Sequence, residues 1–506
     1  MKQFKSILFS ALAFGMTLSA ASCVSERENS LPTSFHVLND LVSFKHQGGE
    51  DIIKVVADAK PSATVKSGNE WCTVEYVNQD DTYNFRVTAT AKDLDDLVGD
   101  TAVVSISEGY SRKEVKVARD PDTVKVVADI GMNSSAQQIA AKIYAGINIG
   151  NTMEAGSNEG SWNAQSAPVN RHYIKALKAA GFNAVRIPCC WYNYLESHED
   201  GIYTIKESWL NHVKDVVTWC ISEDLYVVLN AHWDTGWLED YIFTENEDLQ
   251  DSINAKQKAI WTQIATKMND FDEHLLFAAM NEPGMNETSG KESLWQSNPI
   301  GLQRMKLYQQ TMLDAVRATG GNNAKRVLIM QVPGASISVA KDNGFDATAL
   351  PTDQVEGRLM AEAHFYEPYQ FCLMEEDASW GKMWYYWGAA NHVDGSERNA
   401  TTEYEVAWVD TQMGKLKELF VDKGIPVILG EYGAIIRTMG EGEDQAKHDA
   451  SVAYFGEYVT KTAKNYGIVP FYWETGTVIN HKTGAVIKQS VVDGLIKGAA
   501  AGRYPY

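Results

Sequence analysis

The sequence predicts an α/β protein in which a (β/α)8 TIM barrel follows a small β-sandwich. Two observations predict the barrel. Beyond about residue 139, eight apolar strand-like runs alternate with amphipathic helical stretches, and the polar residues of those runs gather at their C-terminal ends. A third observation predicts the sandwich: residues 35–119 contain short runs rich in Val, Ile, Thr and Tyr, which are separated by turn signals. The expected segments are 1–22, 23–34, 35–120 and 121–506.

Composition and charge narrow the classes of function. The 506 residues are 44% hydrophobic and 22% charged, which is ordinary for a globular protein and excludes disordered and disulfide-dense classes. The formal net charge of −21 repels phosphate backbones, so nucleic acid is not expected as a partner. Many of the 14 Trp and 23 Tyr residues belong to the core, but such a surplus of flat amphipathic rings also suits a groove that stacks on sugars.

The first 22 residues are predicted to be an export signal rather than part of the fold. Lys2 and Lys5 precede an almost wholly apolar stretch over 7–18, and small residues then lead to Cys23. A small-residue run that ends at Cys resembles a bacterial lipoprotein signal, in which this Cys is acylated. The alternative is a plain signal with a nearby Cys. The resemblance implies that residues 23–34 form a tether and that membrane contact is through the lipid anchor only.

The residues just after Cys23 bear on localisation. Ser25, Glu26 and Glu28 follow it, and acidic residues at this place resemble the export signal of Bacteroidetes surface lipoproteins. The resemblance implies a cell outer membrane lipoprotein that is exposed at the surface. No later stretch has the roughly 18 to 20 apolar residues that a membrane helix needs.

The other cysteines do not have the pattern of a disulfide framework. They are odd in number and unevenly spaced: Cys72, Cys189, Cys190, Cys220 and Cys372. The adjacent pair Cys189 and Cys190 could be read as metal ligands, but no Cys/His cluster lies near it in the sequence. We therefore expect this pair to be buried as small apolar side chains.

Residues 35–120 contain the short β-like runs of the sandwich, at 52–56, 83–89, 102–106 and 114–117. The stretches NEWCTV, FRVTA and EVKV within this segment resemble a BACON domain, an immunoglobulin-like module often found at the N-terminus of exported proteins. The family name implies carbohydrate binding, and the alternative role is a spacer. Its single tryptophan, Trp71, is expected in the core.

The barrel strands are expected, in chain order, at 145–151, 182–188, 225–232, 274–283, 326–333, 358–366, 426–433 and 468–474. Apolar residues at three- and four-residue steps predict helices over 169–180, 209–222, 302–318 and 406–423. The fifth connection, 334–357, lacks an obvious long helix. A doubly wound sheet is the alternative fold, but no glycine-rich phosphate-binding turn follows the first strand.

Polar side chains close most of these strands and should converge at one end of the barrel. The set contains one Arg, two His, an Asn, a Tyr, a Trp and two principal carboxylates: Arg186, His232, Asn281, Glu282, His364, Tyr366, Glu431 and Trp473. Two carboxylates facing each other suit glycoside hydrolysis. Metal catalysis is the alternative, but the two His lie on separate strands rather than in an H-x-H pair, so neither a metal nor another cofactor is expected.

The strand-end motifs VRIP, LNAHWD, MNEP, HFYEP, LGEYG and PFYWE, in this order, resemble glycoside hydrolase family 5 over about residues 140–500. The resemblance implies a retaining double displacement with Glu282 as general acid/base and Glu431 as nucleophile. Arg186 and Tyr366 would keep Glu431 ionised, and His364 would tune Glu282.

The resemblance also implies how the reacting sugar is held. Asn281 would hydrogen-bond its 2-hydroxyl, His232 would hold another hydroxyl, and Trp473 would form a stacking floor. Glu474, next to Trp473, is a further candidate for substrate contact. Candidate aromatics for other subsites lie on the strand-to-helix loops: Trp162, Trp191, Trp237, Trp380 and Trp384.

The expected activity is that of an endo-β-1,4-glucanase (cellulase) acting on a cellulose-like, mixed-linkage or xyloglucan polysaccharide. The run GINIGNTMEA after the first strand resembles the endoglucanase branches of the family, whereas His232-Trp233 replaces the His-His of many members. The alternatives are a β-mannanase of the same family and a non-catalytic surface glycan-binding lipoprotein. Expected partners are the β-glucan itself and outer-membrane glycan-uptake proteins.

Overall fold

The computed structural model describes residues 34–92, 99–121, 127–156, 158–199, 201–288 and 293–506. The chain divides into two compact units, Met1–Asp122 and Thr123–Tyr506. The predicted export signal and nearly all of the tether, including Cys23, lie outside the described residues. Within the described ranges, no helix is long and apolar enough to cross a membrane.

The first unit is a β-sandwich, as predicted. One sheet has the strand order β1-β3-β6-β5 and the other has the order β2-β8-β7-β4. The strands are β1 (His36–Val37), β2 (Leu41–Phe44), β3 (Gly49–Val56), β4 (Ser62–Ser67), β5 (Cys72–Gln79), β6 (Tyr83–Ala89), β7 (Asp100–Glu108) and β8 (Ser111–Arg119). Alternate side chains of β6 and β8, such as Phe85, Val87, Val115 and Val117, fill the space between the sheets. Trp71 is buried in this core, as expected.

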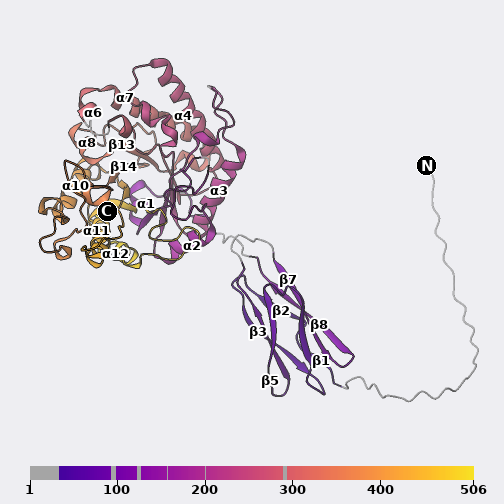
Figure 1. The fold of residues 1–506 in the computed structure, drawn as a ribbon. Helices are drawn as coiled ribbons and strands as arrows, with labels where there is room; N and C mark the ends of the chain where they lie inside the picture. Colours follow the sequence, from indigo (N-terminus) through magenta and orange to yellow (C-terminus); the bar gives the residue numbers. More distant parts are fainter. Residues whose placement is uncertain (1–33, 93–98, 122–126, 157, 200, 289–292) are drawn as a thin grey trace, which may run out of the picture. The chain divides into compact units, whose positions relative to one another are not determined.

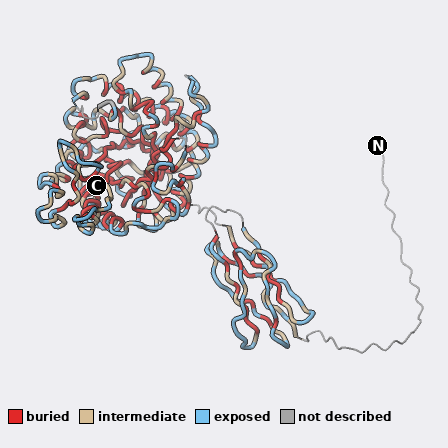
Figure 2. Tube along the Cα trace, viewed as in Figure 1, coloured by how far each residue is buried: buried red, intermediate tan, exposed pale blue. Residues whose placement is uncertain are grey.

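The second unit is the predicted barrel of eight parallel strands, closed in the order β10-β11-β12-β13-β14-β15-β16-β9 (Figure 1). The strands are β9 (Gly146–Asn148), β10 (Ala184–Ile187), β11 (Tyr226–Asn230), β12 (Leu275–Ala278), β13 (Leu328–Ser336), β14 (Leu359–Phe365), β15 (Val427–Tyr432) and β16 (Ile468–Tyr472). Each of the eight expected strands is present. Nearly every strand residue is buried, because the interior is packed and helices cover the outside (Figure 2).

The four predicted helices are α2 (Arg171–Ala179), α3 (Glu207–Ser222), α7 (Ile300–Ala318) and α10 (Val406–Leu419). The structure adds long helices that the sequence analysis did not single out, α4 (Glu247–Lys267), α11 (Gln445–Asn465) and α12 (Gln489–Ala501). Side chains cap two of them, since Asn246 accepts from Leu249 N–H and Asp444 accepts from Lys447 N–H. The fifth connection holds α8 (Ile337–Asp342), a helix of six residues.

A short helix before the first barrel strand, α1 (Ala136–Lys142), packs against the barrel interior. Its buried side chains, Ile139 among them, share one apolar cluster with Val228, Leu276 and Val469, which point inward from three different strands. Ser135 and Gln138 form a capping box that fixes its first turn. This cluster fills the barrel interior below the strand ends that carry the polar residues.

Strand β12 is shorter than predicted, and the difference positions functional residues. The expected strand ran to residue 283, whereas β12 ends at Ala278. Ala279 N–H still donates to the Ile329 carbonyl of β13, and after this residue side chains satisfy the backbone N–H groups of the chain. Gln331 accepts from Met280 N–H at 3.0 Å and Glu239 accepts from Asn281 N–H at 2.5 Å. The motif that carries Asn281 and Glu282 is therefore a loop held by buried side chains.

Candidate active site

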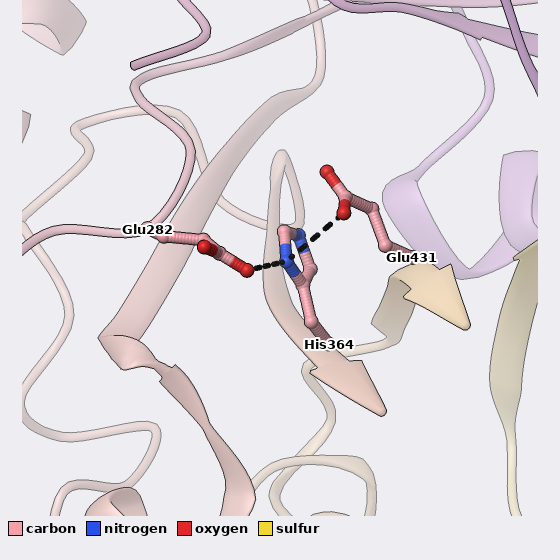
Figure 3. A group of neighbouring side chains, drawn as sticks. All are labelled: Glu282, His364 and Glu431. Atoms are coloured by element: carbon pink, nitrogen blue, oxygen red, sulfur yellow. Dashed lines mark hydrogen bonds and ion pairs between the residues drawn. The ribbon is translucent and has the colours of Figure 1, made fainter. Parts of the chain in front are cut away.

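Two carboxylates and a histidine meet at the C-terminal ends of three barrel strands (Figure 3). Glu282 follows β12, His364 lies in β14 and Glu431 lies opposite it in β15. Nδ1 of His364 is 2.8 Å from Oε1 of Glu282 and 3.7 Å from Oε2 of Glu431. An oxygen of each carboxylate and a ring nitrogen of His364 all lie within 4.8 Å of one another. Carboxylate oxygens this close leave less room than the roughly 6.5 to 9.5 Å that a carboxylate pair needs to hold a water molecule between them.

Arg186, on β10, is fully buried and ties these groups together. One Nη1–H donates to Oε1 of Glu431 at 2.9 Å, and Nη2 donates to Oδ1 of Asn281 at 2.8 Å. Burial disfavours the guanidinium charge, but Glu362 and Glu431 outweigh this effect and raise the pKa of Arg186. A permanent positive charge thus fixes the orientation of both Glu431 and the Asn281 amide.

Glu362 is a charged residue of this network that the sequence analysis missed. It is fully buried in β14, with Oε1 2.9 Å from Nε of Arg186 and Oε2 accepting from Nε2 of Gln331 at 2.8 Å. Burial raises the pKa of this carboxyl, but Arg186 and His364 outweigh burial and leave it below its usual value. A Cβ at Gly430 would lie 2.0 Å from Oε1 of Glu362, so a glycine is needed beside it. The signal available in the sequence was an acidic residue two positions before His364, on the same face of an apolar strand.

His364 is charged in this setting. Burial disfavours the imidazolium, but Glu431, Glu282 and Glu362 raise its pKa to about 10. Its Nδ1 faces Glu282 at 2.8 Å and its Nε2 faces Glu362 at 3.4 Å, so each ring N–H group donates to a carboxyl oxygen. A doubly protonated ring has no lone pair for a metal. Glu282, His364 and Glu431 are close enough to be ligands, but the contacts of His364 with Glu282 and Glu362 engage both of its ring nitrogens.

Tyr366, just after β14, lies beside Glu431. Its hydroxyl donates to Oε2 of Glu431 at 2.9 Å. Burial and the charges of Glu431 and Glu282 hold the pKa of this phenol well above its usual value. Tyr366 therefore stays protonated at neutral pH and donates to Glu431, so both oxygens of Glu431 are engaged.

His232 and Trp473 form another part of the site, with Nδ1 of His232 3.9 Å from Oε1 of Glu431. Their rings stack with centroids 5.8 Å apart and an interplanar angle of 13°. Burial, together with the positive charges of Arg186 and His364, holds the pKa of His232 well below its usual value, so its ring is neutral. A Cβ at Gly150 would lie 3.1 Å from the Trp473 ring, which means that the glycine leaves room for that ring. The partly exposed Trp473 offers a flat apolar face at the site.

Two hollows in the surface include these residues. One, of about 340 Å³, is lined by His232, Asn281 and Glu282, and the other, of about 310 Å³, is lined by Tyr366 and Trp473. The eight predicted site residues of the barrel thus share one end of it. The remaining predicted site residue, Cys23, lies outside the described residues.

The profile of the family described as Cellulase (glycosyl hydrolase family 5) matches residues 146–477, which contain the whole constellation. The chain belongs to glycoside hydrolase family 5. Endoglucanase A of Paenibacillus barcinonensis is 31% identical over 72% of this family 5 chain and 90% of its own length.

Two further relatives are named for xyloglucan. The xyloglucan-specific endo-β-1,4-glucanase of Bacteroides ovatus is 28% identical, and the match spans 98% of this chain and 96% of the relative. A family 5 xyloglucan-specific β-1,4-glucanase from a ruminal metagenomic library, solved in complex with XXLG, is 39% identical with a TM-score of 0.66. That structure covers 74% of this chain, and the match covers 98% of its own chain.

The structure of this family 5 chain corrects one predicted contact. Glu474 is fully buried, and buried groups of the protein occupy its carboxylate. It accepts from the Tyr173 hydroxyl at 2.7 Å and from three backbone N–H groups, among them Gly476 at 2.7 Å and Val478 at 3.0 Å. The prediction that Glu474 contacts substrate is wrong, because its oxygens organise the loop after β16.

The candidate subsite aromatics divide by exposure. Trp191, Trp237 and Trp384 are buried, so they pack in the core and cannot stack on a sugar in this structure. Trp162 and Trp380 are 50% and 65% exposed.

Cys189 and Cys190 are buried, as predicted, and the described cysteines form no disulfide.

Glu239 is a second residue of the site that sequence reasoning missed. It is buried, and its carboxyl accepts from Asn281 N–H at 2.5 Å and from Glu282 N–H at 3.1 Å. Its own carbonyl accepts from Gly284 N–H at 2.9 Å. Burial raises the pKa of Glu239 to about 8, although the two backbone donors act in the opposite direction. A neutral acid thus clamps the backbone that carries Glu282.

The loop after β11 has an unusual backbone. Trp233, Asp234 and Thr235 have φ angles of 40°, 54° and 65°, and Gly236 follows at 77°. Non-glycine residues in this region cost on the order of 1 kcal/mol or more each. The buried Asp234 carboxylate offsets that cost by accepting from Trp191 N–H and from Trp237 Nε1–H, both at 2.7 Å.

Proposed function

We propose that this family 5 protein is a retaining endo-β-1,4-glucanase with Glu431 as nucleophile and Glu282 as general acid/base. The observation that carries the proposal is the closeness of the two carboxylates, since one oxygen of Glu282 lies within 4.8 Å of one oxygen of Glu431. Inverting enzymes leave about 6.5 to 9.5 Å for a water molecule, whereas retaining enzymes need about 5 to 5.5 Å.

In the first step, Glu431 attacks the anomeric carbon and the bond to the leaving oxygen breaks. Arg186 and Tyr366 hold the two oxygens of Glu431 at 2.9 Å, which aims the attack and limits reorganisation. Glu282 gives its proton to the leaving oxygen and becomes a carboxylate. The charged ring of His364, 2.8 Å away, stabilises that carboxylate by donating to it.

In the second step, Glu282 takes a proton from water while the water oxygen attacks the anomeric carbon, and Glu431 leaves as a carboxylate. The same two residues therefore exchange roles and the enzyme returns to its starting state. Asn281, fixed by Arg186, is suited to the sugar 2-hydroxyl. Neutral His232 and the face of Trp473 are suited to another hydroxyl and to the apolar face of the same sugar.

Xyloglucan is the proposed preferred substrate within the β-1,4-glucans. Two of the relatives reported above are named xyloglucan-specific, and one of them matches nearly the whole chain. Reducing-sugar release from xyloglucan, barley β-glucan, carboxymethylcellulose, glucomannan and xylan tests this choice. Faster release from glucomannan than from every glucan would instead support a β-mannanase.

Chemical rescue with azide tests the two roles. Glu282→Ala should keep appreciable activity on an activated aryl glycoside, and azide should accelerate it and give a β-glycosyl azide, because azide attacks the trapped intermediate. Glu431→Ala loses the covalent step, so azide should not restore a retaining reaction. An α-azide from Glu282→Ala, or rescue confined to Glu431→Ala, would reverse or refute the assignment. Binding of glucan without any turnover by the wild type would indicate a glycan-binding protein instead.

We further propose that the protein is a surface lipoprotein of the outer membrane, anchored through Cys23. The small-residue run before Cys23 and the acidic residues after it support this proposal. The β-sandwich, proposed to be a BACON-like module, would then act mainly as a spacer, and glycan-uptake proteins of the same membrane are the expected partners. Cys23→Ala should move the protein from the membrane fraction to the soluble fraction. Unchanged fractionation would contradict the anchor.

A further inference from the structure

Glu362 contacts both cations of the site, although it lies out of reach of a substrate. Its Oε1 is 2.9 Å from Nε of Arg186 and 3.4 Å from Nε2 of His364. Its side chain has no exposed surface. A side chain without exposed surface cannot contact the sugar, so any part that Glu362 has in the reaction passes through its neighbours.

The strands on either side of β14 are shaped to hold this carboxylate. Gln331 of β13 donates through Nε2 to Oε2 of Glu362 at 2.8 Å, and it also accepts from Met280 N–H at 3.0 Å. On the other side, Gly430 of β15 leaves the space that Oε1 occupies, since a Cβ there would lie 2.0 Å from this oxygen. Burying a carboxylate is costly unless it is paired, so its place between the two cations calls for a reason.

The charges of these buried groups balance only when Glu362 is counted. Arg186 and His364 each carry one positive charge. Before the reaction, Glu431 and Glu362 balance these charges while Glu282 holds its proton. After the first step Glu431 is an ester, and Glu282 and Glu362 balance them instead. Without Glu362, both states would keep one uncompensated positive charge out of water, which is costly.

We propose that Glu362 is a positioning residue for proton transfer, because it keeps His364 charged through both steps and so lets Glu282 release its proton. This role rests on the proposed glucanase function. Nδ1 of His364 faces Glu282 at 2.8 Å (Figure 3), and Nε2 faces Glu362 at 3.4 Å. With an amide in place of Glu362, Nε2 can accept a hydrogen bond instead, as the lone pair of a neutral ring. A neutral ring stabilises the Glu282 carboxylate less, because a hydrogen bond between ions is about twice as strong.

Other ionisable groups face the same cluster from the elements packed around it. In the described part of the chain they are Glu154 after β9, Arg186 on β10, His232 and Glu239 after β11, Glu282 after β12, Tyr366 after β14 and Glu431 on β15. The pKa of His232 lies well below its usual value and that of Tyr366 well above, so both stay neutral near pH 7. Burial raises the pKa of Glu154 and of Glu239 to about 8. Because these groups are present in wild type and variants alike, the difference between their pH profiles reports on Glu362.

The pH dependence of kcat/KM in the full-length protein tests this role. Glu362→Gln removes one of the carboxyl groups that raise the pKa of His364 to about 10, so the ring should lose its charge at a lower pH. On a glucan oligosaccharide, whose leaving group needs a proton, the alkaline limb of the profile should move to lower pH by about one pH unit or more. On an activated aryl glycoside, whose leaving group needs no proton, kcat/KM at neutral pH should fall less than on the oligosaccharide.

Two variants separate charge from shape and stability. Glu362→Asp keeps the charge, so its alkaline limb should stay within about 0.5 of the wild-type pH even if the rate is lower. Glu273→Gln is the matched control, because Glu273 is also buried and paired with a cation, Lys142 at 2.8 Å. Glu273 precedes β12 and therefore lies at the other end of the barrel, so its replacement should leave the limb in place.

An unmoved alkaline limb in folded Glu362→Gln, or an equal shift in Glu362→Asp or Glu273→Gln, would overturn the role. If Glu362→Gln does not fold, NMR of wild-type protein labelled with 15N-histidine decides. The ring signals that His364→Gln lacks should show two N–H groups from about pH 6 to pH 8, and a neutral ring would overturn the role. Absence of glucan turnover by the wild type would overturn the glucanase function itself, whereas turnover with an unmoved limb overturns only the part assigned to Glu362.

Discussion

At the scale of single residues, the site depends on one buried cation, the guanidinium of Arg186, which contacts several side chains at once. Arg186 contacts Glu431, Asn281 and Glu362 with different nitrogens of its guanidinium, and a lysine has only one nitrogen to offer. The guanidinium fork therefore sets the positions of the nucleophile and of the amide that faces the sugar.

Arg186→Lys should lower kcat/KM by about 10² to 10³-fold, because the lysine cannot orient Glu431 and Asn281 at once. Initial rates on a soluble glucan oligosaccharide would measure the loss. Arg398→Lys is the control. Arg398 lies outside the site, and its Nη1 pairs with Oδ1 of the partly exposed Asp377 at 2.6 Å. A loss of less than about fivefold in a folded Arg186→Lys protein would contradict the role of the fork.

Glu239 gives a pH prediction at the same scale. Its pKa of about 8 in the folded protein exceeds the ordinary value of 4.5, so the folded state holds more protons than the unfolded state between these pH values. Stability from this group is complete below about pH 4.5 and is lost as the pH rises toward 8. Glu239→Gln keeps an acceptor for the backbone and does not titrate.

Thermal unfolding of Glu239→Gln and of the wild type from pH 5 to pH 8.5 checks this linkage. The melting temperature of the variant minus that of the wild type should become more positive as the pH rises. Glu154→Gln should follow the same trend, because burial also raises the pKa of Glu154 to about 8. Parallel pH curves for variant and wild type would show that Glu239 is already ionised in the folded protein.

At the scale of elements, the loop after β16 depends on a buried carboxylate rather than on apolar packing alone. Glu474 satisfies the Tyr173 hydroxyl, backbone N–H groups of Gly476 and Ile479, and the ring of His481 at 2.6 Å. Loops of barrel enzymes carry the functional residues, and their backbone groups still need partners once buried. Glu474 supplies those partners for the segment that follows Trp473.

Glu474→Ala should destabilise the protein by about 3 to 5 kcal/mol, because several buried donors lose their acceptor. Chemical denaturation would measure the loss, and KM for oligosaccharide should change little at temperatures where the variant is folded. Glu376→Ala, an exposed acid on another loop, serves as the control for charge removal. A raised KM at unchanged stability would restore the idea that Glu474 contacts substrate.

At the scale of the whole molecule, the two units have separate cores and the site belongs to the second alone. The sandwich core around Phe85 and Val117 shares no cluster with the barrel core. The residues assigned to chemistry all follow Asn148. Every described residue assigned to the site therefore belongs to the second unit.

A truncated chain that begins at Thr123 should keep kcat/KM on a soluble oligosaccharide within about twofold of the full chain, because every group in the site belongs to the second unit. Comparing the truncated and full chains on insoluble or membrane-associated polysaccharide tests separately whether the β-sandwich acts as a spacer or binds glycan. A tenfold loss on the soluble substrate would mean that the sandwich contributes to the site.

The sequence by itself determined the sandwich, the eight barrel strands and the residues that close them. Local patterns carry this information, because alternation, helical periodicity and polar strand ends are properties of neighbouring residues. The motifs that contain Arg186, Glu282 and Glu431 were sufficient to place these side chains at one end of a closed barrel.

Only the tertiary structure decided which side chains meet there and which do not. Glu362 and Glu239 join the site because of contacts across strands and loops, with Arg186 at 2.9 Å and with the Glu282 backbone at 3.1 Å. Glu474, although next to Trp473 in the chain, is fully buried, and Trp233 is partly exposed on a turn that Asp234 ties to Trp191 of another loop. Contacts between distant segments depend on packing and on the pairing of buried polar groups, which no local pattern encodes.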